Sequence, residues 1–307
     1  MPDLASVTVR SPAKINLVLG VGAPREDGFH PLATVYQAVG VYDDVTVTQA
    51  RATTLTVAGE GVDVVDVPTD GTNLALRAVA ALAAHHGLSP VDSGVTLHVV
   101  KRVPVSGGMA GGSTDAAAAL VAVDRLWGLR TPEDALAAIA AELGSDVPFC
   151  LVGGTATGHG RGELVTPVAD HSTCWWVVAL PGGGLSTPAV YREADRLRAG
   201  CAVAEPVVPD DLLGALAAGS IDGVAAAVAN DLEPAALSLR PELADVLQLG
   251  RSAGALAGLV SGSGPTCLFL AGDRDHADRL AARLRGDGLA CLVAPGPVPG
   301  ARVVAPL

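Results

Sequence analysis

A glycine-rich segment, residues 106–114 with the sequence SGGMAGGST, is the part of this chain best suited to bind a ligand. Four of its glycines fall within six positions, and a backbone without Cβ atoms can turn sharply and approach a bound group closely. A β-branched strand pattern precedes the segment and a helical pattern follows it. A helix N-terminus favours anions, so this order predicts a phosphate-binding loop. The alternative is a flexible surface loop before a capped helix.

Three isolated charged residues are also considered: two lysines and one aspartate. Lys14 and Lys101 are the two lysines among twenty basic residues, and the others are arginines. A lysine in such a composition suggests a position that needs a compact ammonium group. Lys14 has an ordinary alternative as a strand-end lysine whose stem covers apolar surface. Asp146, in the segment LGSDVPF, could likewise be an ordinary N-cap or turn aspartate before Pro148.

Composition limits the classes of function. The 307 residues are 50% hydrophobic, but no run reaches the ~20 apolar residues of a spanning helix. No secretory signal is recognisable, so we expect a cytoplasmic protein. A net charge of −12 argues against nucleic acid or an anionic membrane as partner. The scattered cysteines and histidines form no metal-spaced cluster, which predicts neither disulfides nor a protein metal site. Monomer and homodimer both remain open.

The pattern of elements predicts an α+β protein in two units, 1–169 and 170–307. In the first unit, predicted strands are 6–10, 15–21, 35–39, 45–47, 53–57 and 95–103, with a hairpin at 156–168. Predicted helices are 73–85, 113–127 and one capped by Thr131 with Pro132 at its first position. Residues 145–148 are predicted as a tight connection. The second unit has the order β-α-β-β-α-β with extra helices, two of them within 209–239, which is typical of a ferredoxin-like fold.

The glycine loop resembles the second motif of the GHMP kinases, P-x-x-x-G-L-G-[GS]-S-[SA]. Met109-Ala110 departs from the Leu-Gly of that motif. Residues 12–17, PAKINL, resemble the first motif of these enzymes, and 261–266, SGSGPT, their C-terminal glycine loop. The resemblance implies an ATP-dependent small-molecule kinase that uses Mg²⁺, with an N-terminal lobe like domain 2 of ribosomal protein S5 and a ferredoxin-like C-terminal lobe. It implies ATP contacts from Asn73, Lys101, Pro104, Ser106, Gly107, Gly108, Gly111, Gly112, Ser113 and Thr114.

Within these kinases, the chain resembles the group that phosphorylates the 2-hydroxyl of a cytidyl-diphosphate-linked methylerythritol in non-mevalonate isoprenoid biosynthesis. The matching segments are REDGFHPL (25–32), LGSDVPF (143–149) and GRGELVTPV (160–168). The resemblance implies that Asp146 is the general base and Lys14 its partner. It implies substrate contacts from Asn16, Phe29, His30, Thr187 and Tyr191.

Several alternatives remain open at this stage. Another GHMP kinase, for mevalonate, homoserine or a sugar, would share the loop but lack the 25–32 segment as a cytosine reader. A nucleotide-binding protein without activity would need neither Lys14 nor Asp146. The glycine spacing does not fit a nicotinamide oxidoreductase. Asn73 could simply cap a helix, Tyr191 could make an ordinary helix contact, and Asp115 could hold metal or complement the helix dipole.

Overall fold

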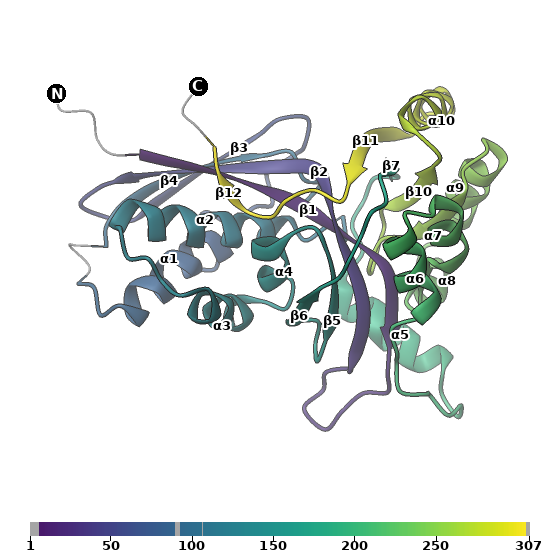
Figure 1. Cartoon of the computed structure of the whole chain (residues 1–307), viewed down its shortest axis with the longest axis horizontal. Helices are drawn as coiled ribbons and strands as arrows, with labels where there is room; N and C mark the ends of the chain where they lie inside the picture. Colours follow the sequence, from purple (N-terminus) through teal and green to yellow (C-terminus); the bar gives the residue numbers. More distant parts are fainter. Residues whose placement is uncertain (1–5, 90–92, 106, 305–307) are drawn as a thin grey trace.

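The computed structural model describes residues 6–89, 93–105 and 107–304, which form two lobes, each built on one β-sheet (Figure 1). The first sheet has the order β12-β1-β2-β4-β3, with the β5–β6 hairpin attached to β2 and β8 attached to β1. Its strands are β1 (Ser6–Val21), β2 (Leu32–Gln49), β3 (Thr54–Gly59), β4 (Val95–Lys101), β5 (Thr155–His159), β6 (Leu164–Pro167), β8 (Ala229–Asn230) and β12 (Arg302–Val303).

Strands β1 and β2 are far longer than the sequence pattern predicts, because each joins two predicted strands into one. Their antiparallel register shifts between Pro12 and Ala13 and again between Asn16 and Val18. Such bulges break the regular alternation of apolar and polar residues and re-aim side chains. Lys14 lies between the two shifts, so the irregularity that obscures the strand also positions this side chain.

The first sheet is covered on one face by four helices (Figure 1). They are α1 (Leu74–His85), α2 (Gly111–Trp127), α3 (Glu133–Leu143) and α4 (Val147–Val152). Helix α2 is alanine-rich, and its buried run from Ala116 to Ala119 lets it lie close against the sheet.

Two local predictions in this lobe are wrong. Residues 147–152 form helix α4 and not a tight connection, because Pro148 fits the first turn of a helix. Thr131 does not cap α3, because its hydroxyl donates to Asp124 and Pro132 occupies the N-cap position.

The second sheet confirms the predicted ferredoxin-like order. Its strands run β11-β7-β10-β9, and all neighbours are antiparallel. The chain visits β7 (Cys174–Leu180), α5 (Thr187–Leu197), β9 (Ala257–Val260), β10 (Cys267–Ala271), α10 (Arg274–Gly286) and β11 (Ala290–Gly296). Between α5 and β9 lie α6 (Asp210–Ala218), α7 (Ile221–Ala227), α8 (Glu233–Leu239) and α9 (Glu242–Ser252).

The predicted pair of helices within 209–239 is therefore three. Gly219, in the left-handed region, ends α6, and Ser220 caps α7. Helices α9 and α10 cover one face of the second sheet, and α6, α7 and the long strands cover the other.

Short pairings tie the two lobes together. Strand β8 pairs with β1 in parallel, and β12 returns from the end of the described chain to pair with the start of β1. The predicted boundary at 169/170 stays a prediction, but the last strand belongs to the first sheet.

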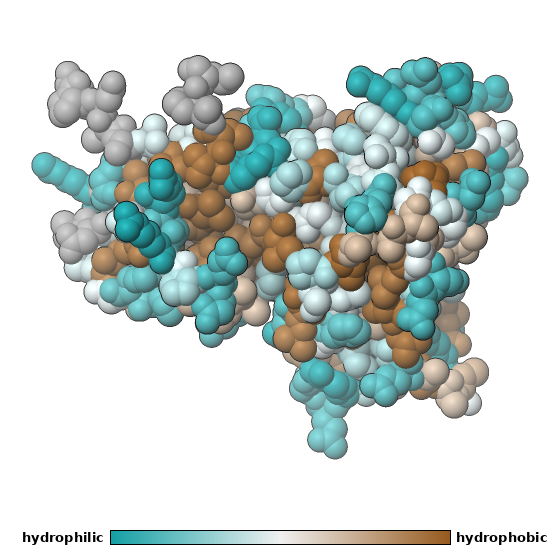
Figure 2. All heavy atoms as spheres, viewed as in Figure 1, coloured by the Kyte–Doolittle hydropathy of each residue, from teal (hydrophilic) through white to brown (hydrophobic). Residues whose placement is uncertain are grey.

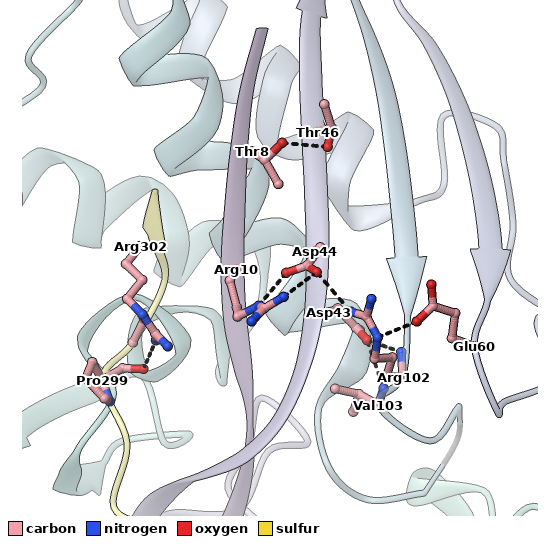
Figure 3. Close-up of polar contacts among 11 residues, drawn as sticks. Thr8, Arg10, Asp43, Asp44, Thr46, Glu60, Arg102, Val103, Pro299 and Arg302 are labelled. Atoms are coloured by element: carbon pink, nitrogen blue, oxygen red, sulfur yellow. Dashed lines mark hydrogen bonds and ion pairs between the residues drawn. The ribbon is translucent and has the colours of Figure 1, made fainter. Parts of the chain in front are cut away.

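Within the first lobe, charged side chains link β1, β2 and the residues that follow β3 and β4 (Figure 3). Asp44 pairs with Arg10 and Arg102, and Arg102 pairs with Glu60. No helix in the described ranges is long and apolar enough to cross a membrane.

The 22–31 loop between β1 and β2 projects from the body of the molecule, at the lower edge of Figure 1. Figure 2 shows that its tip is hydrophilic. This loop carries the predicted cytosine reader, so the fold presents that segment as an arm and not as part of the core.

Candidate active site

A cavity of about 730 Å³, which we call the central cavity, lies where the glycine loop, β1, β2, the 22–31 loop and α5 converge. Residues from both lobes line it. The predicted site residues in its wall are Lys14, Asn16, Phe29, His30, Pro104, Gly107, Gly108, Gly111, Gly112, Asp146, Thr187 and Tyr191. The structure therefore brings together predicted site residues that lie as far as 177 positions apart, from Lys14 to Tyr191.

Lys14 is almost fully buried at one side of this cavity. Its Nζ donates to Oδ1 of Asn16 at 2.9 Å and lies 3.4 Å from Oδ1 of Asp146. Asn16 is held in turn by its amide, which donates to the hydroxyl of Thr34 at 2.7 Å. An ammonium group has three donors, so with a single carboxylate partner it can also attract a phosphate oxygen.

Asp146 stands at the N-cap position of α4, yet its side chain makes no capping hydrogen bond. The carboxylate is 30% exposed and lines the central cavity. This placement argues against the interpretation of Asp146 as a simple turn or cap residue, since a capping side chain would bond to the backbone of its own helix.

Asp146 contributes to raised pKa values of three neighbouring side chains, two tyrosines and one cysteine. Burial raises the pKa of Tyr191 to about 12, and the nearby Asp146 adds to the shift. Burial likewise raises the pKa of the Cys150 thiol to about 12, again with a contribution from Asp146. Burial also raises the pKa of Tyr36 well above its usual value, and the charge of Asp146 adds to the shift. The three groups therefore stay protonated around one carboxylate.

The glycine loop enters α2 through a left-handed turn. Ala110 has φ 60° and ψ 34°, a conformation that glycine adopts more easily, so the departure from the family motif is accommodated in the structure. At Gly108 a Cβ would lie 2.3 Å from the carbonyl oxygen of Ser261, so only glycine fits there. The Ser261 hydroxyl donates to the Gly108 carbonyl at 3.2 Å. The second glycine loop therefore packs directly on the first.

Three ring-bearing residues, Phe29, His30 and Tyr191, also line the central cavity and form what we call its aromatic end. The rings of His30 and Tyr191 have centroids 4.9 Å apart, and Arg161 lies 5.1 Å from the centre of the Phe29 ring. His30 Nε2 is 2.9 Å from Oδ1 of Asp195. A carboxylate only accepts, so this ring nitrogen carries a proton. This end offers flat apolar surfaces and polar edges, which suit a planar heterocycle.

Some predicted ATP-binding residues lie away from the cavity wall. Asn73 caps α1 by accepting from the Ala75 amide, and the hydroxyl of Thr114 donates to the Pro12 carbonyl at 3.0 Å. Lys101 is buried between two carboxylates. Ser113, in the first turn of α2, is not part of the wall. Their contacts with ATP stay predictions, and Ser106 falls outside the described residues.

The carboxylates that hold Lys101 are those of Asp43 and Asp115, at 2.6 and 2.7 Å from its Nζ. Asp115, for which metal binding and complementing the helix dipole were both open, has its carboxylate paired with a lysine inside the first lobe. Lys101 Nζ also donates to the Gly111 carbonyl at 3.3 Å, so it supports the glycine loop from behind.

Sequence reasoning did not single out four further lining residues: Tyr36, Arg161, Arg192 and Asp195. Tyr36 sits in an apolar strand, where an aromatic residue is ordinarily a core residue. The other three are charged residues without a recognisable spacing. To predict Arg161 and Asp195 as lining residues, one would need to know which loop faces which helix.

No group of three or more metal-ligating His, Cys, Asp or Glu residues occurs in the part of the chain that the structure describes. Magnesium bound with a nucleotide needs only one or two protein oxygens, since phosphates and water supply the others. Asp146 is paired with Lys14, so a magnesium ion would be held here mainly by the nucleotide phosphates beside the glycine loop.

Comparisons with known proteins agree with this architecture. The model of the GHMP kinases N terminal domain matches residues 73–154, and that of the GHMP kinases C terminal region matches residues 212–288. The 4-diphosphocytidyl-2-C-methyl-D-erythritol kinase of a Nocardioides species is 60% identical over 301 residues, which cover 96% of this chain and 99% of that protein. The enzyme of the same name from Streptomyces avermitilis is 57% identical, with coverage of 97% and 100%.

Solved structures give the same result. A crystal structure of 4-(cytidine 5'-diphospho)-2C-methyl-D-erythritol kinase has a TM-score of 0.75 and 34% identity, and the alignment covers 94% of this chain and 99% of that one. Homoserine kinase from Cytophaga hutchinsonii has a TM-score of 0.74 at 18% identity, which shows a shared fold alone. The chain belongs to the GHMP kinases and, within them, to the 4-diphosphocytidyl-2-C-methyl-D-erythritol kinase family.

Proposed function

We propose that this enzyme transfers the γ-phosphoryl group of ATP to the 2-hydroxyl of 4-diphosphocytidyl-2-C-methyl-D-erythritol, with Asp146 as general base and Lys14 beside it. The observation that carries the proposal is the pairing of these two side chains at 3.4 Å in the wall of the central cavity. The glycine loop borders the same cavity, so a phosphate held by that loop would lie next to the pair.

Phosphoryl transfer needs mainly positioning and neutralisation of charge. As the substrate hydroxyl oxygen bonds to the γ-phosphorus, the bond from that phosphorus to the β,γ-bridging oxygen breaks and ADP leaves. Asp146 accepts the hydroxyl proton, and Lys14 stabilises the charge on the transferring group. Asn16 holds the ammonium in place through its 2.9 Å contact.

The glycine loop and the first turn of α2 supply backbone N–H groups and the positive end of a helix dipole to the ATP phosphates. Magnesium, bound with the nucleotide, neutralises phosphate charge. Gly107, Gly108, Gly111 and Gly112 border the cavity and permit close approach of these phosphates.

The aromatic end of the cavity is suited to the cytosine ring. Phe29 and Tyr191 offer stacking surfaces, and His30, oriented by Asp195, offers a polar edge. Arg161 and Arg192 supply positive charge near the substrate diphosphate, which an acidic protein must otherwise repel.

The proposal is tested by ADP release with ATP and Mg²⁺, offering the cytidyl substrate beside mevalonate, homoserine and galactose. We expect turnover with the cytidyl substrate alone. Asp146→Asn should lower kcat by ~10²–10⁴ while ATP still binds, because it removes only the base. Asp134→Asn, an exposed aspartate in the first turn of α3, is the matched control and should leave kcat unchanged.

Turnover of another alcohol would overturn the cytosine assignment and keep the kinase chemistry. ATP binding without turnover of any alcohol would favour a binding protein. Full activity in Asp146→Asn would remove Asp146 from its role as base.

A further inference from the structure

We propose that Asn230 is a positioning residue for phosphoryl transfer: its side-chain amide fixes the second glycine loop, residues 261–266, against the phosphate-binding glycine loop. The inference rests on the proposed function in one respect, the binding of ATP phosphates by the first loop. Asn230 lies on β8 and is not part of the cavity wall. It therefore acts through the two loops and not by contact with a ligand.

The side-chain amide of Asn230 makes three hydrogen bonds that fix its orientation. Its Nδ2 donates to the carbonyl of Val260 at 2.8 Å and to that of Gly262 at 2.7 Å. Its Oδ1 accepts from the Leu232 amide at 2.9 Å. An asparagine amide has two donor hydrogens, and both are used here, on the two sides of Ser261. One side chain thus holds the chain at two points where it enters the second glycine loop.

The segment that Asn230 holds lies directly against the first glycine loop. Ser261 is fully buried, and its hydroxyl donates to the Gly108 carbonyl at 3.2 Å. A Cβ at Gly108 would lie 2.3 Å from the Ser261 carbonyl oxygen, so the two loops leave no space between them at this point. A displacement of Ser261 would therefore also displace the phosphate-binding loop, because close-packed groups transmit such shifts.

Gly262 is the point at which the second glycine loop depends most on Asn230. It lines the central cavity, and its φ of +54° is a conformation that glycine adopts without strain. Across the residues that the structure describes, the hydrogen bond from Asn230 is the one that holds the Gly262 carbonyl. The end of β9 has a second support, because the Glu233 carboxylate accepts from the Val260 amide at 2.8 Å. Loss of the Asn230 amide should therefore release the loop at Gly262 and leave β9 in place.

Asn230 is itself anchored to the strand that carries Lys14. Strand β8 pairs with β1 with Asn230 opposite Leu19, and the Asp231 amide donates to the Leu19 carbonyl at 2.9 Å. The Asp231 carboxylate accepts from the Val21 amide at 2.9 Å. Asn230 thus connects β1 of the first sheet with the loop that follows β9 of the second. It thereby sets where the phosphates lie relative to Lys14, and positioning is the main requirement of phosphoryl transfer.

The test compares Asn230→Leu and Asn230→Asp with Ser220→Ala. Asn230→Leu removes both donors without adding charge, and Asn230→Asp puts an acceptor in their place. Ser220→Ala removes the cap of α7, so it lowers stability from a position outside both glycine loops. We expect both Asn230 variants to lower kcat about tenfold and to raise the Kd of MgADP about tenfold, with the KM of the alcohol changed by less than about twofold. Ser220→Ala should match the wild type in all three.

Hydrogen exchange without any ligand separates the inference from the proposed function. In Asn230→Leu, peptides that cover 107–112 and 260–264 should exchange faster than in the wild type, because the two loops lose their common support. Unchanged exchange in both peptides overturns the inference, even if the wild type turns over the cytidyl substrate. An unchanged Kd for MgADP with a raised KM for the alcohol also overturns it, since Asn230 would then act on the substrate side. So does an effect confined to Asn230→Asp, which the added charge would explain.

Discussion

The two lysines of this chain both contact the glycine loop, but their ammonium groups have different partners. Both extend from strands of the first sheet, Lys14 from β1 and Lys101 from β4, and both are buried, with exposures of 6% and 2%. Lys101 contacts two carboxylates, at 2.6 and 2.7 Å. Lys14 contacts one, at 3.4 Å, and a neutral amide oxygen.

The difference lies in how many donors remain for a ligand. An ammonium group has three donors. Those of Lys101 are all used, by Asp43, Asp115 and the Gly111 carbonyl. Lys14 borders the central cavity, where a phosphate oxygen can complete its contacts. A buried lysine with saturated partners supports structure, whereas one with an incomplete set beside a cavity can stabilise a reacting group.

The largest expected effect comes from removing the saturated lysine. Lys101→Met leaves the carboxylates of Asp43 and Asp115 buried without their cation, so the free energy of unfolding should fall by about 4 kcal/mol. Asp43 is fixed in place because it also accepts from the Arg102 and Val103 amides at 2.6 and 2.8 Å (Figure 3). Urea denaturation measures the loss. A loss below about 1 kcal/mol would show that the pair is not a structural support.

The next largest effect is expected from Lys14→Met, and it should lower kcat more than the free energy of unfolding. Lys14→Met should lower kcat about a hundredfold, or about 3 kcal/mol of transition-state stabilisation, because a charge facing the transferring group is lost. Its free energy of unfolding should change by less than about 1 kcal/mol, since Asp146 stays partly solvated. ADP release and urea denaturation of the two lysine variants, measured side by side, provide the comparison. If Lys14→Met and Lys101→Met lowered the free energy of unfolding equally, the two lysines would not differ in their structural role.

Sequence reasoning located the glycine loop because its signal is local: a strand, a turn and a helix in order along the chain. The ferredoxin-like order of the second lobe was predicted for the same reason. Lys14 stood out as one of two lysines, and Asp146 through the resemblance to the GHMP kinases. Lys101 was a less informative prediction, because a lysine that binds phosphate and one that binds two aspartates look alike in sequence. Asp43 lies 58 positions before Lys101, and the residues next to it in the sequence do not indicate this ion pair.

Other features depend on tertiary contacts that a pattern does not encode. The long course of β1 was hidden by two bulges, and these bulges are what direct Lys14 and Asn16. Tyr36 reads as an ordinary core residue until the hairpin glycines that surround its hydroxyl are placed beside it. The features that the sequence did not predict are therefore those in which the burial of one residue is decided by a distant segment.

The smallest expected effect comes from the weaker carboxylate of the Lys101 cluster. Asp115 Oδ2 accepts from Lys101, but its buried Oδ1 has no hydrogen-bond partner in the described structure. Burial raises the pKa of Asp115 well above its usual range, although the nearby Lys101 opposes the shift and Asp43 adds to it. Asp115→Asn keeps the shape, leaves Lys101 paired with Asp43, and should change the free energy of unfolding by only about 1 kcal/mol.

The sharper readout of Asp115→Asn is the dependence of its stability on pH. Because the folded state binds this proton more tightly than the unfolded chain does, the wild type should lose stability as pH rises from about 4 through the raised pKa of Asp115. The Asn variant cannot titrate there, so its stability should fall less over the same window. Urea midpoints of both proteins across that range give the difference. A difference that stays constant with pH would show that Asp115 is ionised in the fold, and Lys101 would then stand between two full negative charges.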